Sequence, residues 1–191
     1  MRLPVNTDEL TGLANARSLA AQLGATAQCA VLLLEIGDFE GLLIDLSDEV
    51  HGQVFFQLAR TLRRELGREV GRELGREVGR EVGREVGREV GRHGSCGRWG
   101  NNQFVVLLPY AGRQAALGMA DLLRQKLTAL EFGEPFTLSI GVAVSSAQVT
   151  GLDLLHVAAK RLSTAQAGGG DRIMAESVPA HQNSGQELDV A

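Results

Sequence analysis

One short polar stretch of the chain holds the side chains whose types and spacing could do chemistry. It lies between two apolar runs and reads Trp99, Gly100, Asn101, Asn102, Gln103 and Phe104. Glycine and asparagine tolerate positive φ, so the stretch predicts a tight β-hairpin turn. The turn presents amides and no acid. Amides accept hydrogen bonds but lack the charge with which proteins hold Mg²⁺, so we expect no metal-assisted chemistry at this hairpin.

Two carboxylates follow an earlier apolar run and are the remaining candidates for metal-dependent chemistry. Glu35 lies near the end of the run Ala30–Ile36, and Asp38 is three residues further on. Neither supplies a second acid at the hairpin, so we expect weak metal binding or none. A solvent-facing carboxylate at a strand end is an equally good interpretation of Glu35. His93 and Cys96 are only a two-ligand fragment of a zinc site, and we interpret them as loop residues.

The elements that must position these residues follow from the apolar patterning. Continuous apolar runs predict strands, and apolar residues at helical spacing predict helices. The predicted strands are Ala30–Ile36, Gly97–Trp99, Phe104–Pro109 and Phe136–Val144. The predicted helices are Ala14–Leu23, Asp48–Arg64, Arg113–Leu130 and Asp153–Ala167. Their order, β-α-β-β-α-β, predicts an α+β sandwich of the ferredoxin-like or palm type, with extra helices at the N-terminus and near the C-terminus.

Composition and charge limit the classes of protein to consider. With 191 residues, 44% of them hydrophobic, the chain suits one globular domain over residues 1–175. No apolar run approaches about 18 residues, the length of a membrane span, and no signal-peptide core follows Met1, so we expect a cytoplasmic protein without membrane contact. The net charge of −4 argues against nucleic acid as a partner. Residues 176–191 are polar and lack periodicity, which predicts a disordered tail.

A low-complexity repeat interrupts the predicted domain. Residues Glu65–Arg92 form seven consecutive tetrapeptides of the pattern Glu-Leu/Val-Gly-Arg. Each Glu-Arg pair at this spacing favours a helix by about 0.2–0.5 kcal/mol, but each Gly opposes one by about 0.8–1 kcal/mol, so the repeat should be marginal as an isolated helix. We favour a solvated, partly ordered spacer. The alternative is a helical arm for a partner or for self-association, with Arg64, Arg68 and Arg72 as candidate contacts.

Several further segments share a pattern with one known family. They are Asp8–Arg17, Leu32–Phe39, Thr137–Ala143, and Leu154–Ala158 together with Asp171–Ile173. With the hairpin, these segments resemble the GGDEF family of bacterial diguanylate cyclases, which join two GTP molecules into cyclic di-GMP. The first segment, close to D-x-L-T-G-L-x-N-R-R, is the most specific match. The resemblance covers residues 6–175, interrupted by the repeat 65–92, and it implies a palm-type fold.

The resemblance also implies reactive positions, and this chain has replaced them. The family has two acidic residues in the hairpin and two aspartates at the end of the first strand, which form its metal site. It also has polar residues against guanine and cations against phosphate. The residues now present are Glu35, Gly37, Asn102 and Gln103 for the metal, Leu43 and Gly52 for guanine, and Gln166 and Gly170 for phosphate. The family's inhibitory R-x-x-D is missing after Arg92. Gly168–Gly170 is better interpreted as a helix C-cap than as a phosphate cradle, because it follows a helix.

These departures lead to one primary prediction and two alternatives. The primary prediction is a catalytically inactive GGDEF-like domain that acts by contacts with a protein partner or a second copy in cyclic-di-GMP signalling. Trp99 and the repeat arm are its candidate contacts, although a Trp at a strand end more often belongs to a core. The first alternative is a receptor that binds GTP or cyclic di-GMP without turnover. The second is a cyclase with residual activity through Glu35 and Asp38. Mg²⁺ or Mn²⁺ would be needed only for these alternatives, and no other cofactor is expected.

Overall fold

The protein consists of one sheet with helices on both sides. A computed structural model describes residues 6–37, 39, 41, 48–77, 94–132, 136–145 and 149–175, with the backbone alone at 48–49 and 68–77. The strands are β1 (Cys29–Gly37), β2 (Ser95–Arg98), β3 (Gln103–Pro109), β4 (Thr137–Val144) and β5 (Ile173–Met174). The helices are α1 (Ala16–Ala25), α3 (Asp48–Glu77), α5 (Arg113–Thr128) and α6 (Gly151–Ala167). Each predicted strand and helix is present, with shifted boundaries.

The strands form a five-stranded sheet in the order β2-β3-β1-β4-β5. β1 pairs antiparallel with β3 and with β4, β2 pairs antiparallel with β3, and β5 adds a parallel edge to β4. The predicted palm-type α+β sandwich is confirmed. Because β1 is central, its residues are covered on both faces of the sheet, which explains its continuous apolar run.

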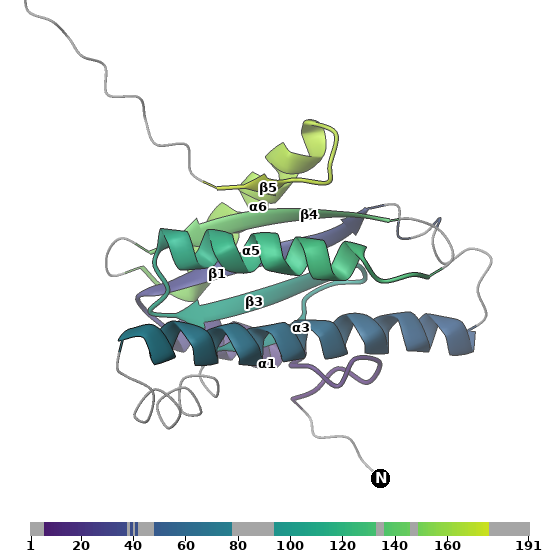
Figure 1. Ribbon diagram of the computed structural model, residues 1–191, viewed down its shortest axis with the longest axis horizontal. Coiled ribbons are helices and arrows are strands. Elements are labelled where there is room, and N and C mark those ends of the chain that lie inside the picture. The colour runs from purple at the N-terminus through teal and green to yellow at the C-terminus, as the bar shows by residue number, and fades with distance from the viewer. Residues whose placement is uncertain are drawn as a thin grey trace, which may run out of the picture.

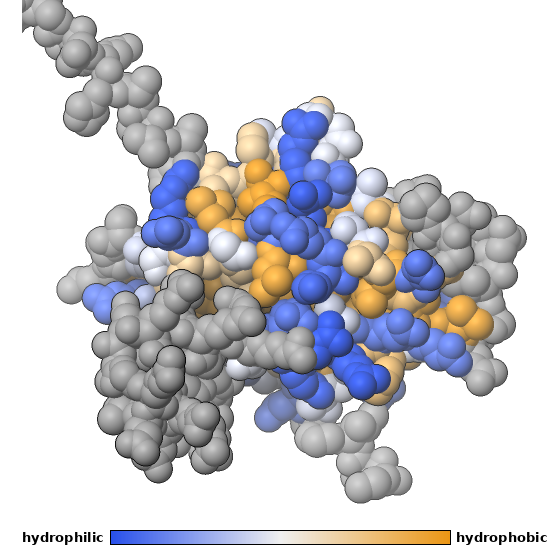
Figure 2. Space-filling model, in the orientation of Figure 1, coloured by the Kyte–Doolittle hydropathy of each residue, from blue (hydrophilic) through white to orange (hydrophobic). Residues whose placement is uncertain are grey.

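Helices cover both faces of the sheet (Figure 1). α3 and α5 lie over one face, where Leu58 and Leu123 belong to the same buried cluster as Leu34 of β1. α1 and α6 cover the other face, where Leu155 shares a second cluster with Val31. The helices predicted as additions to the sandwich therefore form a third layer. Seen from outside, the middle of the face formed by α3 and α5 is mostly hydrophilic (Figure 2).

Local capping and pairing explain the shifted boundaries. α1 begins two residues later than predicted, because the Asn15 side chain caps it by accepting a hydrogen bond from Ser18 N at 2.9 Å. α6 begins two residues earlier than predicted, since Thr150 and Asp153 form a capping box ahead of it. β2 starts at Ser95, which pairs with β3 before the predicted strand begins.

α3 is longer than predicted, because it continues past Arg64 through the first repeats to Glu77. The repeat is marginal as an isolated helix, but a helix already nucleated by tertiary packing extends at little cost. The first tetrapeptide also joins the core, since Glu65 and Leu66 are buried. Residues 78–92 of the repeat and the predicted disordered tail 176–191 lie outside the described residues. Neither α3 nor any other described helix is both long and apolar enough to span a membrane.

Candidate functional site

Strand pairing brings the hairpin amides beside the end of β1. Glu35 lies opposite Gln103 of β3 on one side and opposite Ser139 of β4 on the other. The end of α6 reaches the same edge of the sheet and contributes Gln166, whose side chain bonds to Glu35. Residues that the sequence analysis assigned to separate motifs therefore meet at one place.

Two amides hold the Glu35 carboxylate, and we refer to Glu35, Gln103 and Gln166 as the amide clasp. Gln103 Nε2 donates to Glu35 Oε2 at 2.6 Å, and Gln166 Nε2 donates to Glu35 Oε1 at 2.5 Å. The amide nitrogens must face the carboxylate, because an ionised carboxylate only accepts hydrogen bonds. Hydrogen bonds to a charged acceptor are stronger than neutral ones. The clasp therefore joins β1, β3 and α6 and engages both oxygens of Glu35.

Asn102 bonds to the backbone of β1. Its Nδ2 donates to Ile36 O at 2.9 Å, and Ile36 N donates to Asn102 O at 3.1 Å. The backbone bond continues the antiparallel ladder between β1 and β3 into the hairpin loop, and the side-chain bond lies beside it. The two hairpin amides consequently have different partners, one on the strand backbone and one on Glu35.

Arg98, which the sequence analysis did not single out as a functional residue, closes the hairpin loop. Its Nε donates to Gly100 O at 3.1 Å, and its Nη2 donates to Asn101 O at 3.0 Å. Gly100 and Asn101 do not adopt the positive φ expected of a tight turn. The loop is wider, with Trp99 N and Gly100 N both donating to Gln103 O. The available signal was a basic side chain next to a loop whose carbonyls need donors.

The most specific sequence motif forms a turn that supports the hairpin. Asp8 Oδ1 accepts hydrogen bonds from Thr11 N at 2.9 Å and Thr11 Oγ1 at 2.7 Å, and Gly12 follows at a φ of 64°. Asp8 Oδ2 lies 3.5 Å from Arg98 Nη1. The Arg98 guanidinium also lies 4.1 Å from the centroid of the Phe55 ring on α3. Arg98 thus connects the hairpin, the N-terminal turn and α3.

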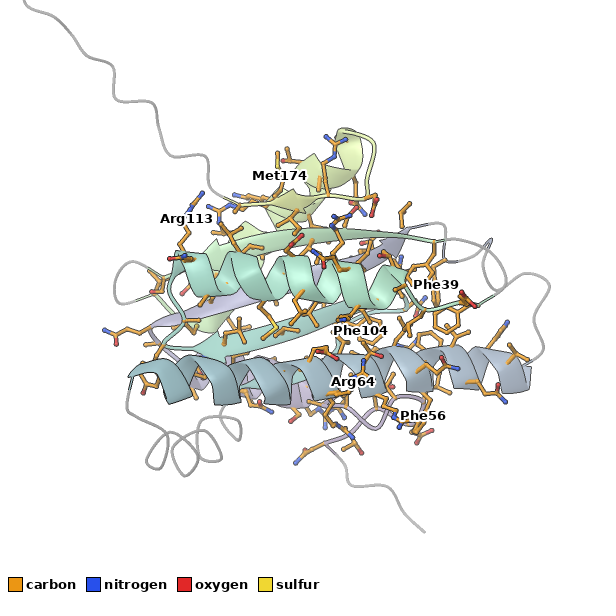
Figure 3. All side chains as sticks on the ribbon, viewed as in Figure 1. Phe39, Phe56, Arg64, Phe104, Arg113 and Met174 are labelled. Carbon is orange, nitrogen blue, oxygen red and sulfur yellow. The ribbon has the colours of Figure 1, made fainter. Side chains whose placement is uncertain are left out.

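Three other candidate side chains, those of Trp99, Phe104 and Arg64, make their contacts outside the amide clasp. Trp99 is half-buried and packs against the core beneath α1 and α6. Phe104 is buried in the opposite core and lies between α3 and α5 in Figure 3. Arg64 pairs with the adjacent glutamate at 2.6 Å, whereas Arg68 and Arg72 belong to the part of α3 described by backbone alone. Asp38, Leu43 and His93 lie outside the described residues.

The glycines after α6 form its C-terminal cap. The N–H groups of Gly168, Gly169 and Gly170 donate to carbonyls of the last turns of α6, and the latter two glycines have φ values of 107° and 72°. The C-cap interpretation is confirmed, because these N–H groups point back into the helix and away from any phosphate site. Gly52, the described position implied for guanine, is a glycine of α3 without a side chain to recognise a base.

The described residues do not fit a divalent cation. They contain no cluster of three or more His, Cys, Asp and Glu side chains. At the amide clasp a cation would meet amide hydrogens already directed at both oxygens of Glu35. Cys96, half of the zinc fragment, is buried, and this burial raises the pKa of its thiol to about 11. Metals bind the thiolate, so a thiol with so high a pKa is a poor ligand.

Comparison with known proteins identifies a family. A family model described as "Diguanylate cyclase, GGDEF domain" matches residues 5–172. No curated protein sequence matches the chain. The solved GGDEF domain of DgcB from Caulobacter crescentus, in complex with c-di-GMP, is similar with a TM-score of 0.69 at 19% identity, over 92% of this chain and 98% of that chain.

Two structures from Pseudomonas aeruginosa are similar to a comparable degree. The diguanylate cyclase SiaD, in complex with its activator SiaC, has a TM-score of 0.68 at 24% identity, over 89% of this chain and 61% of that chain. The GGDEF domain of FimX has a TM-score of 0.66 at 20% identity, over 89% of this chain and 99% of that chain. At these identities the likeness shows a common fold.

Proposed function

The chain belongs to the GGDEF domain family, and we propose that it is a member without diguanylate cyclase activity that acts through protein contacts in cyclic di-GMP signalling. The observation that carries the proposal is the amide clasp. Its three side chains occupy positions at which the family resemblance implies two acids and a phosphate-binding cation. In this chain they bond to one another instead.

The clasp lacks the charges that the reaction requires. Joining two nucleotides by phosphoryl transfer depends on divalent ions held by carboxylates and on cations against the phosphates. Gln103 and Gln166 are neutral, and their NH₂ groups engage both oxygens of Glu35. Without those charges the described residues offer little electrostatic stabilisation to a transferring phosphoryl group.

The contacts that hold the scaffold together are present in this chain, whereas the positions implied for the reaction carry other residue types. The Asp8 turn, the Arg98 contacts and the hairpin backbone bonds are all in place. A retained scaffold without its reactive groups is suited to recognition. SiaD, which has a similar fold, forms a complex with the protein SiaC, and this supports protein binding as the function.

An assay for product tests the loss of activity. The purified protein is incubated with GTP and either Mg²⁺ or Mn²⁺, and cyclic di-GMP is measured by chromatography. We expect no product above the background without protein. The variant Gly37→Asp/Asn102→Asp/Gln103→Glu restores the implied acids, and we expect it to remain inactive because the guanine and phosphate positions are still changed. Product from the unaltered protein would overturn the proposal.

Calorimetric titration separates the proposal from the receptor alternative. The Gly100 N–H could have faced a phosphate, but it donates to Gln103 O at 3.3 Å. We therefore expect GTP and cyclic di-GMP to bind no more tightly than about 1 mM. Binding of either nucleotide near 1 μM, roughly 4 kcal/mol stronger, would replace the proposal by a receptor function.

A further inference from the structure

Exposed apolar side chains mark a surface outside the amide clasp. Among the described residues, the large hydrophobic side chains that remain exposed are Leu10, Phe56, Tyr110 and Val157. Single exposed hydrophobic residues are ordinary, but a cluster of them indicates an interaction site. Phe56 is 58% exposed on α3 and Leu10 is 49% exposed in the N-terminal turn. These two come from neighbouring elements.

Two contacts place the N-terminal turn along α3. At one end, Arg98 contacts both Asp8 and the ring of Phe55, the residue before Phe56. At the other end, Arg63 Nη2 donates to Gly12 O at 2.7 Å. The turn that carries Leu10 therefore runs beside α3 between these contacts. In Figure 3, Phe56 lies on the side of α3 next to this N-terminal segment.

Two arginines follow the exposed phenylalanine along α3. Phe56, Arg60 and Arg63 follow one another at spacings of four and three residues, so they share one face of α3. Within the described part of the chain, neither arginine forms an ion pair with a carboxylate, whereas Arg64 is neutralised by Glu65. This face of α3 is thus locally basic, although Glu9 is exposed in the adjoining turn and the whole chain has a net charge of −4.

We propose that Leu10, Phe56, Arg60 and Arg63, the α3 docking surface, bind an acidic segment of a protein partner that carries an apolar side chain. The proposal rests on the proposed function, because it names the surface through which protein contacts are made. Aromatic residues and arginine are the side chains most enriched in the energetic centres of protein interfaces. Unpaired arginines beside an apolar anchor are complementary to carboxylates beside an apolar side chain.

The charge of the α3 docking surface favours an acidic protein segment over a second copy of the chain or a nucleic acid. In a two-fold contact between copies of α3, the arginines of one copy would lie against those of the other, and facing like charges oppose association. Nucleic acid calls for a basic footprint that follows many phosphates. The described surface supplies two arginines without a carboxylate partner, one of them bonded to Gly12 O, on a chain of net negative charge. An acidic protein segment is therefore the occupant that fits.

Fluorescence polarisation with designed peptides tests the docking surface on the full chain. The probe is a labelled helical peptide with Glu and Leu on one face, compared with a peptide in which Lys replaces every Glu and another in which Ser replaces every Leu. We expect the Glu/Leu peptide to bind most tightly. Phe56→Ala and Arg60→Glu should each weaken that binding about tenfold, because truncating an anchor at the centre of an interface costs about 1.4 kcal/mol or more.

A matched pair of variants on α6 provides the control. Val157 and Lys160 are an exposed apolar residue and an exposed cation on one helix face on the opposite side of the sheet. We expect Val157→Ala and Lys160→Glu to leave peptide binding within about twofold, as surface positions outside an interface do. Circular dichroism melts check that all four variants fold.

Several outcomes would overturn the docking surface. The first is that the Glu/Leu peptide does not bind. The second is that the Lys peptide binds as tightly as the Glu/Leu peptide. The third is that the α6 variants weaken binding of the Glu/Leu peptide as much as the α3 variants do. Sedimentation analysis and titration with a single-stranded oligonucleotide complete the test, since self-association or oligonucleotide binding abolished by Phe56→Ala would assign the surface to those occupants. None of these readouts depends on GTP turnover, so failure here leaves the assay for cyclase activity as a separate result.

Discussion

Beside Glu35, the amide of Gln103 stands where the family resemblance implies a second acid. Two carboxylates separated by the 2.6 Å between the side chains of Glu35 and Gln103 would repel each other unless a cation or a proton lay between them. An amide at the second position converts this repulsion into a hydrogen bond, because its NH₂ group is a donor. The amide clasp is therefore satisfied by its own side chains.

Restoring the acid at position 103 should destabilise the domain. In Gln103→Glu the carboxylate of Glu35 loses a donor and gains a like charge, and we expect the free energy of unfolding to fall by about 1–2 kcal/mol. Urea denaturation at neutral pH without divalent ions measures this loss.

The exchange Glu35→Gln/Gln103→Glu is the matched control for that variant. It keeps one amide and one carboxylate in contact with their positions reversed, so it should recover at least half of the lost stability, as coupled neighbours do in a double-mutant cycle. Additive losses in the double variant would contradict the hydrogen bond between the two side chains.

At the scale of elements, the start of α6 makes a stability contribution that depends on pH. The Thr150 hydroxyl donates to Asp153 Oδ2 at 2.7 Å and the Thr150 backbone N–H donates to the same atom at 3.2 Å. Mainly through the hydroxyl bond, Thr150 holds the pKa of Asp153 below its ordinary value. The folded chain therefore favours the ionised form more than the unfolded chain does. The contribution to stability is present above the unfolded pKa and is lost as the pH falls through the folded pKa.

Removing the hydroxyl should raise this pKa. In Thr150→Ala we expect the pKa of Asp153 to move towards its ordinary value and the acid-side loss of stability to become shallower. Carboxyl chemical shifts followed by NMR through the acid range measure the pKa, and urea denaturation over the same range measures the stability. An unchanged pKa in the variant would show that the cap does not hold the carboxylate in solution.

The contact between α6 and the sheet depends on one glycine. A Cβ at Gly141 of β4 would overlap Ala158 O and Leu162 N, which are backbone atoms of α6. Backbone atoms cannot rotate away, so Gly141→Ala should lower the free energy of unfolding by about 1–3 kcal/mol. Gly118 on α5 is the control, because no atom lies within 4 Å of its Cβ position. Gly118→Ala should raise stability by about 0.5–1 kcal/mol in the same denaturation experiment.

At the scale of the whole molecule, the first tetrapeptide of the repeat lies against the residue that precedes β2. The Cβ position of Gly94, just before β2, is 3.4 Å from Leu66 Cδ1 in the first tetrapeptide. Removal of Glu69–Arg92 joins Arg68 to His93, which are two residues and one residue along the chain from Leu66 and Gly94. We expect the deletion to change the free energy of unfolding by less than about 1 kcal/mol, because loop length affects stability only weakly. Thermal and urea denaturation measure the change.

A longer deletion is the control for the shorter one. Removing Glu65–Arg92 also removes the buried Leu66 and Glu65, and we expect a loss of about 2–5 kcal/mol, as for truncation of a buried leucine. Equal stability of the two shortened proteins would contradict the assignment of the first tetrapeptide to the core.

The pattern of apolar residues predicts the sheet well because each buried strand is a continuous apolar run in its own part of the sequence. The three apolar runs that become β1, β3 and β4 carry the fold class, and the predicted family is confirmed by the match over residues 5–172. Capping and tertiary packing set the boundaries. They move the start of α1 past Asn15 and carry α3 through three tetrapeptides that are weak helix formers alone.

The sequence by itself determined the layout of the domain and the residue types at the positions where the family resemblance implies reactive groups, since apolar periodicity and residue type are properties of the local chain. Only the tertiary structure decided what those residues contact. Gln103 and Gln166 are 68 and 131 positions from Glu35, and strand pairing with the packing of α6 brings both amides onto its carboxylate. Long-range contacts of this kind leave no local pattern, so the amide clasp, the role of Arg98 and the surface around Phe56 emerge only when the chain is folded.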